Sequence, residues 1–313
     1  MYRKESRPRA SWLVKLLPLL LFLGACATGA IREKQLTLPV IDGATSVGQA
    51  ACVECHEGMS AGVHSRLAGF EYMGGSEGCE ACHGPGSTHM RWAEQSVDSA
   101  KLSTPPAPAG YGFSMDFAAG GTEATIQQCA SCHARREQLG EGNPLPGTAF
   151  HDAYTLSQLR PGLYHADGQI LDEVYVYGSF LQSKMYQAGV TCSDCHNPHS
   201  AELLTGANPN DVCAQCHLPT KFAGTEHAAH TVEQAGCVDC HMPSRTYMVV
   251  DDHRDHSFRV PRPDLTVAIG TPSTCTDCHA DQSAGWSAEA AERWYGTERF
   301  AKPHYGQILQ AGR

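Results

Sequence analysis

The chain has 313 residues, with 33 acidic and 23 basic side chains and a formal net charge of −10 at pH 7. An acidic chain is repelled by the phosphate backbone, which argues against nucleic acid as a partner and permits docking to a basic protein. The 15 cysteines and 17 histidines narrow the function further, because nearly all the cysteines fall in one repeated pattern.

The first 25 residues have the features of a bacterial lipoprotein signal peptide. A basic segment precedes the apolar run 16–23, which is too short to span a bilayer. The run leads into Leu-Gly-Ala-Cys, which resembles a lipobox and implies cleavage before Cys26 and lipid attachment to its sulfur. An ordinary secretory peptide is the alternative. Ala27 resembles an outer-membrane sorting residue. We therefore expect an exported protein that is lipid-anchored, with residues 26–45 as a tether and the outer membrane, on its periplasmic face or at the cell surface, as its location.

From residue 52 onward the sequence repeats Cys-x-x-Cys-His seven times, with 21 to 63 residues between the starts of successive motifs. This is the attachment signature of c-type haem, in which two thiols add to the porphyrin vinyl groups and the histidine becomes the proximal iron ligand. Zinc sites and disulfide frameworks also use paired cysteines, but neither requires a histidine directly after each pair. We therefore predict seven covalently bound haem c groups. The thioether cysteines would be Cys52, Cys55, Cys79, Cys82, Cys129, Cys132, Cys192, Cys195, Cys213, Cys216, Cys237, Cys240, Cys275 and Cys278, and the proximal ligands His56, His83, His133, His196, His217, His241 and His279.

The spacing of the motifs predicts a mainly α fold with extensive irregular coil, wrapped around a chain of closely packed haems. Residues 46–280 would form the heptahaem domain, and residues 281–313 a helix and tail packed on it. We expect helices over 126–138, 172–187 and 287–295, the last one capped by Ser287 and ended by Gly296. Residues 104–110 are rich in proline and predict a loop, and no alternating strand longer than 247–250 is expected.

Ten histidines lie outside the motifs, so seven irons could each receive a second histidine ligand. Methionine is the other common distal ligand. The methionines available for it are Met59, Met73, Met90, Met115, Met185, Met242 and Met248, which we expect to pack in the interior instead.

Several short stretches resemble the superfamily that contains cytochrome c554, hydroxylamine oxidoreductase and the pentahaem nitrite reductases. Cys-His-Gly-Pro-Gly-Ser-Thr-His at 82–89 resembles its CHGPGxxH element, in which the last histidine is a distal ligand, and so nominates His89. His64 is similar to the distal histidine that these proteins place soon after the first motif. Cys-His-Asn-Pro-His at 195–199 resembles a CHxPH element and nominates His199, and Cys-His-Met-Pro followed by Asp-His nominates His256. The stretch 247–264 is also similar to bacterial multihaem proteins that carry tetratricopeptide repeats, although this sequence contains no such repeats after the last motif.

For the remaining distal positions we select among histidines that lie in no recognisable family element. His151, His165 and His230 complete the expected set, with His227, His253 and His304 in reserve. His304 is the alternative to His151.

Three functions remain open from the sequence. Electron relay through bis-histidine haems, between a membrane or periplasmic donor and a terminal reductase or extracellular acceptor, is the leading one. The alternative is an oxidoreductase acting on nitrite, hydroxylamine or tetrathionate at one open haem, with Arg135, Arg136 or Lys184 as charge-stabilising groups. No motif ends in lysine, as the catalytic motif of the pentahaem nitrite reductases does. The third is an interaction module, in which the protein is a subunit of a larger respiratory complex or a polymerising cytochrome.

Overall fold

The structure is a computed structural model that describes residues 43–59, 62–64, 78–97, 105–140, 144–247, 249 and 251–313. The chain divides into two compact units, Met1–Leu38 and Pro39–Arg313, and every described residue belongs to the second. The expected signal peptide, the lipidation site Cys26 and most of the tether lie outside the described residues, as do Met73 and Met248.

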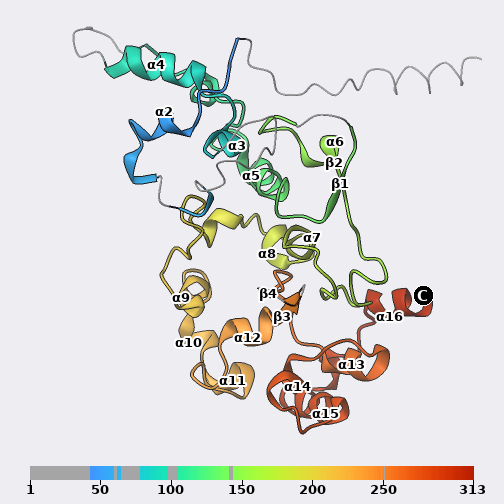
Figure 1. Cartoon of the computed structure of the whole chain (residues 1–313). Coiled ribbons are helices and arrows are strands. Elements are labelled where there is room, and N and C mark those ends of the chain that lie inside the picture. Colours follow the sequence, from blue (N-terminus) through green and yellow to red (C-terminus); the bar gives the residue numbers. More distant parts are fainter. Residues whose placement is uncertain are drawn as a thin grey trace, which may run out of the picture. The chain divides into compact units, whose positions relative to one another are not determined.

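Short helices joined by long irregular segments make up the described part of the chain (Figure 1). In the first half the elements are α2 (Gln49–Val53), η1 (Glu57–Met59), α3 (Glu80–His83), α4 (Ser87–Val97), η3 (Ala109–Gly112), α5 (Gly121–Ala130), β1 (Arg136–Gln138), α6 (Phe150–Ala153) and β2 (Tyr154–Leu156). The strands β1 and β2 form an antiparallel pair, in which Glu137 faces Thr155.

The second half continues the same pattern. Its elements are α7 (Tyr177–Phe180), α8 (Lys184–Gln187), η4 (Cys192–Asp194), α9 (Pro209–Ala214), α10 (Pro219–Phe222), α11 (Thr225–Ala228), α12 (Cys237–His241), β3 (Ser244–Tyr247), β4 (Asp251–Arg254), α13 (Pro263–Ile269), α14 (Thr274–Cys278), α15 (Ala284–Tyr295), η5 (Thr297–Arg299) and α16 (Tyr305–Ala311). The strands β3 and β4 form a second antiparallel hairpin.

The expected mostly helical and irregular fold is confirmed, but two of the expected helices are shorter than predicted. The helix expected over 126–138 ends at Ala130, because the third motif turns the chain there and residues 136–138 pair with β2. The helix expected over 172–187 divides into α7 and α8 at Ser183, whose backbone is extended and whose hydroxyl accepts a hydrogen bond from Tyr186 N–H. Competition from such a capping side chain interrupts a helix.

The helix α15 begins at Ala284, three residues before the predicted start at residue 287. Its N-cap is Ser283, whose hydroxyl accepts from Trp286 N–H at 3.1 Å, whereas Ser287 is buried inside the helix. The predicted end is confirmed, because Gly296 follows the last helical residue with φ +79°. Residues 105–108 are irregular, and η3 starts at Ala109.

Apolar side chains form only two small clusters in the described part of the chain. The first brings together Ile126, Ala130, Ala134, Phe150, Tyr154, Tyr177 and Phe180. The second consists of Leu163, Tyr164, Ile170, Val174 and Tyr247. A domain of this length normally buries a larger core of its own side chains. We expect bound cofactors to supply the apolar surface that these two small clusters lack. In the described segments, no helix is both long enough and apolar enough to cross a membrane.

Candidate haem-attachment and axial-ligand sites

Each Cys-x-x-Cys-His motif folds as a single helical turn. In six of the seven, the histidine N–H donates to the carbonyl of the first cysteine at 2.9 to 3.0 Å. The remaining one, the sixth motif, forms the helix α12 itself. Residues three and four apart on such a turn share one face. Both thiols and the imidazole therefore project to the same side, as thioether attachment with proximal ligation requires. None of the fourteen motif cysteines is in a disulfide.

The motifs are arranged in adjacent pairs through their first cysteines. The thiols of Cys52 and Cys79, from the first and second motifs, interact. Burial raises the pKa of Cys52 to about 11, and the neighbouring Cys79 raises it further. Burial raises the pKa of Cys213 to about 11, and the nearby thiol of Cys237 raises it further. This contact links the fifth motif to the sixth. A hydrogen bond between the thiols of Cys129 and Cys192 links the third motif to the fourth and raises the pKa of Cys129.

The second cysteines connect one pair of motifs to the next. Burial raises the pKa of Cys82 to about 11, with a further contribution from Cys132 of the third motif. Burial also raises the pKa of Cys195, and Cys216 of the fifth motif raises it further. The pKa of Cys240 is raised by burial and next by Cys275 of the seventh motif. Each motif therefore neighbours the next one along the chain, from the first to the seventh. Contacts of α5 with η4, α9 with α12, and α12 with α14 agree with this order.

Six of the seven motif histidines face a histidine ring from outside the motifs. The ring centroids of each pair lie 6.1 to 6.4 Å apart, and the interplanar angles range from 5° to 76°. The pairs are His56 with His89, His133 with His64, His83 with His199, His196 with His256, His241 with His227, and His279 with His230.

This separation matches two imidazoles on one metal ion. An ion bonded to a nitrogen of each ring at about 2 Å places the two centroids about 6.3 Å apart. Aromatic pairs in general have centroids roughly 4.5 to 7 Å apart, so the narrow range shared by the six pairs is the distinguishing feature. The varied interplanar angles are those of rings free to rotate about a metal–nitrogen bond. The six pairs thus fit bis-histidine haem ligation.

The hydrogen bonds of the distal rings leave the correct nitrogen for the metal. Nδ1 of His64, His89, His230 and His256 lies 2.5 to 3.0 Å from a backbone carbonyl oxygen, of Pro198, Tyr111, Ala228 and Arg254 respectively. A carbonyl can only accept, so Nδ1 carries the proton and Nε2 presents its lone pair. Carbonyl acceptors of this kind orient the histidine ligands of metal sites. Among the proximal ligands, His241 makes the same bond to Arg259, at 2.6 Å.

Burial favours the neutral, metal-binding form of several of these rings. Desolvation by burial lowers the pKa of His83 to about 4, and the neighbouring His199, His89 and His56 lower it further. Burial likewise lowers the pKa of His133, His241 and His256. A buried imidazole avoids the cost of carrying a charge and stays unprotonated at neutral pH.

One buried carboxylate fixes the chain around the second motif. Glu80 is 1% exposed, and its oxygens accept hydrogen bonds from the backbone N–H of Val47, Gly48 and Gly86 at 2.7 to 3.2 Å. Gly84 follows the motif with φ +89° against Ser114, a position that only glycine fills without strain. These contacts place α4, and with it His89, beside the first motif.

The structure brings five of the seven expected distal histidines to a motif histidine, namely His64, His89, His199, His230 and His256. The sixth pair uses His227, which the sequence placed in reserve. His227 and His230 stand three residues apart at the short helix α11, yet they face two different motifs. The spacing His-x-x-His midway between the fifth and sixth motifs is the signal that would have favoured His227.

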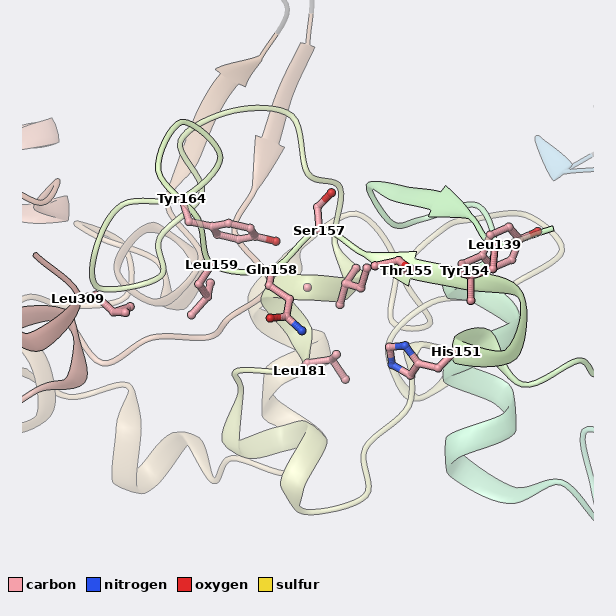
Figure 2. A pocket seen from close by; sticks show the side chains of 12 residues that line it. Leu139, His151, Tyr154, Thr155, Ser157, Gln158, Leu159, Tyr164, Leu181 and Leu309 are labelled. Carbon is pink, nitrogen blue, oxygen red and sulfur yellow. The ribbon is translucent and has the colours of Figure 1, made fainter. Parts of the chain in front are cut away.

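The other expected distal ligands, His151 and His165, face no motif histidine. His151 packs edge-on against Phe150 and lines a hollow of about 640 Å³ together with Tyr154, Leu181 and Leu309 (Figure 2). His165 is bound into a turn through its backbone N–H, which donates to Gln169.

The two reserves left over are engaged elsewhere. His304 is the N-cap of α16, where Nδ1 accepts from Gly306 N–H at 3.1 Å. Its proton therefore sits on Nε2, which is the wrong tautomer for a ligand bound through Nε2. His253 lies in β4, with Nδ1 3.4 Å from a Glu173 carboxylate oxygen.

Two of the three cations considered for catalysis, Arg135 and Arg136, closely follow the third motif, and Arg136 donates to the carbonyl of Ser131 inside that motif at 2.5 Å. Arg135 pairs with Asp172 at 3.1 Å, and the Arg136 guanidinium lies 3.8 Å from the centre of the Tyr154 ring. Lys184 is the first residue of α8.

Comparisons with known proteins agree with the motif geometry. The family model for the doubled CXXCH motif matches residues 185–222, which contain the fourth and fifth motifs. The chain is 26% identical over 163 residues to multiheme cytochrome MtrA of Shewanella baltica, a match that covers 50% of this chain and 43% of MtrA. It is 25% identical over 253 residues to the C-type polyheme cytochrome OmcC of Geobacter sulfurreducens, covering 66% of this chain and 31% of OmcC.

The crystal structure of outer cell wall cytochrome OcwA is similar to 69% of this chain and 57% of its own, with 18% identity and a TM-score of 0.42. The matches thus span less than half the length of the two curated relatives. Together with the repeated attachment turn, the sequence matches define a class. The chain is a multihaem c-type cytochrome with several covalently attached haems.

Proposed function

We propose that this protein is an electron relay that carries seven haems and passes electrons along them in the order of the motifs. The observation that carries the proposal is the row of attachment turns, in which α5 contacts η4, α12 contacts both α9 and α14, and thiols of successive motifs are neighbours. Neighbouring thiols hold neighbouring porphyrins, and closely spaced haems exchange electrons without chemistry at a substrate.

The paired histidines support the same function. Two imidazole ligands fill both axial positions of an iron, and haems with two histidines have lower potentials than those with histidine and methionine. The pairs also interlock distant parts of the chain, because five of the six distal ligands come from a segment nearer to another motif. Such bracing keeps the iron positions fixed during oxidation and reduction.

The proposal includes a location at a membrane. The lipobox-like segment around Cys26 would anchor the relay by a lipid, with a membrane or periplasmic donor on one side and a terminal reductase or an extracellular acceptor on the other. Radiolabelled palmitate should enter the native protein and not a Cys26→Ala variant. Equal labelling of both would contradict the anchor.

The relay is tested by counting electrons and timing their transfer. Haem assay against protein mass should give seven haems per chain. After complete reduction, mixing with a soluble ferric chelate should reoxidise all the haems at one common rate, because electrons redistribute among neighbours faster than they leave. A group of haems that reoxidises much more slowly than the rest would contradict a continuous relay.

A further inference from the structure

His217, in the fifth motif, is the one motif histidine that faces no other histidine ring. All seventeen histidines of the chain lie in its described part, so this comparison includes every candidate. The ring of His217 instead packs edge-on against Phe222, with centroids 5.5 Å apart. The other six motif histidines each have a partner at 6.1 to 6.4 Å.

Phe222 packs edge-on against two histidine rings, His217 and His227. The same ring lies 5.3 Å from His227, so it separates the proximal ligand of the fifth haem from the distal ligand of the sixth. Phe113 has the equivalent place in the first pair of motifs, 5.4 Å from His83 and 4.5 Å from His89. In that pair both irons still have a second histidine. A phenylalanine between two ligands therefore does not replace one.

The four histidines outside the six pairs are held away from His217 by contacts of their own. His304 caps α16 and has the wrong tautomer, and His253 is fixed in the β3–β4 hairpin beside Glu173. His151 lies against Phe150, and His165 is held in the turn that ends at Gln169.

The methionines in the described part of the chain are likewise engaged away from His217. Met59, Met90, Met115 and Met242 follow or accompany the first, second and sixth motifs, as the hydrogen bonds of Met59 N–H to His56 and of Met115 N–H to His83 illustrate. Met185 packs against the cluster around Phe150.

The fifth attachment turn lies at the surface. Residues 214–221 are exposed, as are residues 54–59 at the first motif, so exposure alone does not distinguish the fifth motif from the others. The turn is nevertheless well placed, because Asn210 of α9 accepts a hydrogen bond from Cys237 N–H at 2.9 Å and so connects the fifth motif to the sixth.

From these observations we infer that the haem held by Cys213, Cys216 and His217 keeps an exchangeable sixth position for a small molecule from solution. The ligand class is that of small molecules with a free lone pair, of the size of carbon monoxide, nitric oxide or cyanide. This inference rests on the ligand pairs proposed above and goes beyond electron relay, because it gives one haem a binding site.

The first test uses the native protein with all its haems and carbon monoxide as the probe. The fully oxidised protein should show one high-spin haem in electron paramagnetic resonance, and the reduced protein should bind one carbon monoxide per chain. Absence of carbon monoxide binding would overturn the inference, as would a purely low-spin spectrum, whether the sixth ligand came from a methionine or from a second copy of the chain.

A second test locates the site. Replacing both cysteines of the fifth motif, Cys213→Ser with Cys216→Ser, should remove one haem and abolish carbon monoxide binding. The matched control, Cys52→Ser with Cys55→Ser, should also lose one haem but keep the binding. Carbon monoxide binding that survives loss of the fifth haem would overturn the assignment.

A third variant separates this inference from the ligand pairs beneath it. His89→Ala opens the first haem and should raise the stoichiometry from one carbon monoxide to two. An unchanged stoichiometry would overturn the proposed pairs, and the inference with them. If His89→Ala gains one site while the native protein binds none, the pairs stand and only the open fifth haem is refuted.

Discussion

At the scale of single residues, the choice of distal ligand depends on which nitrogen carries the proton. His64, His89, His230 and His256 donate Nδ1–H to a carbonyl and present Nε2, whereas His304 accepts at Nδ1. Sequence spacing contains no information about tautomers. That is why His304 looked as suitable as His151 before the backbone around each was known.

The pairing of His227 with His241 predicts different outcomes for two similar substitutions. His227→Ala should convert one further haem from low spin to high spin, because the sixth haem loses its second ligand. His151→Ala is the matched control and should leave the spin states unchanged. Electron paramagnetic resonance of the two oxidised variants measures both effects. The opposite result would restore the original assignment of His151.

Glu80 provides the second prediction for a single residue. Glu80→Ala leaves three backbone N–H groups, one buried and two part-buried, without their carboxylate acceptor, which should lower the free energy of unfolding by about 3 kcal/mol. Glu54 lies between the two cysteines of the first motif and is exposed, so Glu54→Ala should cost much less. Chemical denaturation of the haem-loaded proteins compares the two. Equal losses would show that the hydrogen bonds of Glu80 contribute little.

At the scale of elements, α15 packs against histidines at both of its ends. Trp286 near the start of α15 lies 4.9 Å from the ring of His279, and Trp294 near its end lies 6.1 Å from His230. Tyr295 donates a hydrogen bond to the carbonyl of His227 at 2.6 Å. One helix therefore contacts His279 of the seventh motif and the loop with His227 and His230, the distal ligands proposed for the sixth and seventh haems.

Removing the aromatic contact to His230 should loosen the seventh haem. Trp294→Ala should weaken His230 ligation by about 1 kcal/mol, the size of a typical aromatic edge contact. Optical spectroscopy during heating should show one haem changing from low spin to high spin at a lower temperature than in the native protein. Tyr305→Phe removes the hydroxyl contacts of Tyr305 with Asp167 and Gln182, which touch neither His230 nor His279, and should leave this temperature unchanged. A shift in both variants would point to general destabilisation.

At the scale of the whole molecule, the haems take the place of a hydrophobic core. The two apolar clusters are small for a chain of this length, and the ligand pairs join segments far apart in sequence. A chain without its haems loses both the apolar porphyrins and these iron bridges, so too little buried surface remains to offset the conformational entropy of folding.

The haem-free chain should therefore be unfolded. Expression without the haem-attachment machinery should yield protein that protease digests rapidly and whose circular dichroism lacks a cooperative thermal transition. Protein made with the machinery is the control and should resist digestion. A haem-free chain that melts cooperatively would show that its side chains suffice for a core.

The sequence by itself determined the chemistry of attachment. Seven Cys-x-x-Cys-His motifs are local features, because one helical turn places two thiols and an imidazole on one face regardless of what surrounds it. The short helices were less predictable, since capping by Ser183 and Ser283 and strand pairing at residues 136–138 decide where each one ends.

Only the tertiary structure decided which histidine meets which motif, because a second axial ligand is chosen by proximity in space. His199 follows the fourth motif but faces the second, and His64 follows the first but faces the third. The lack of a histidine partner for His217 likewise depends on the folded structure and not on spacing in the sequence. Ten histidines outside seven motifs are enough to fill every iron by count, yet the folded backbone carries four of them to other places.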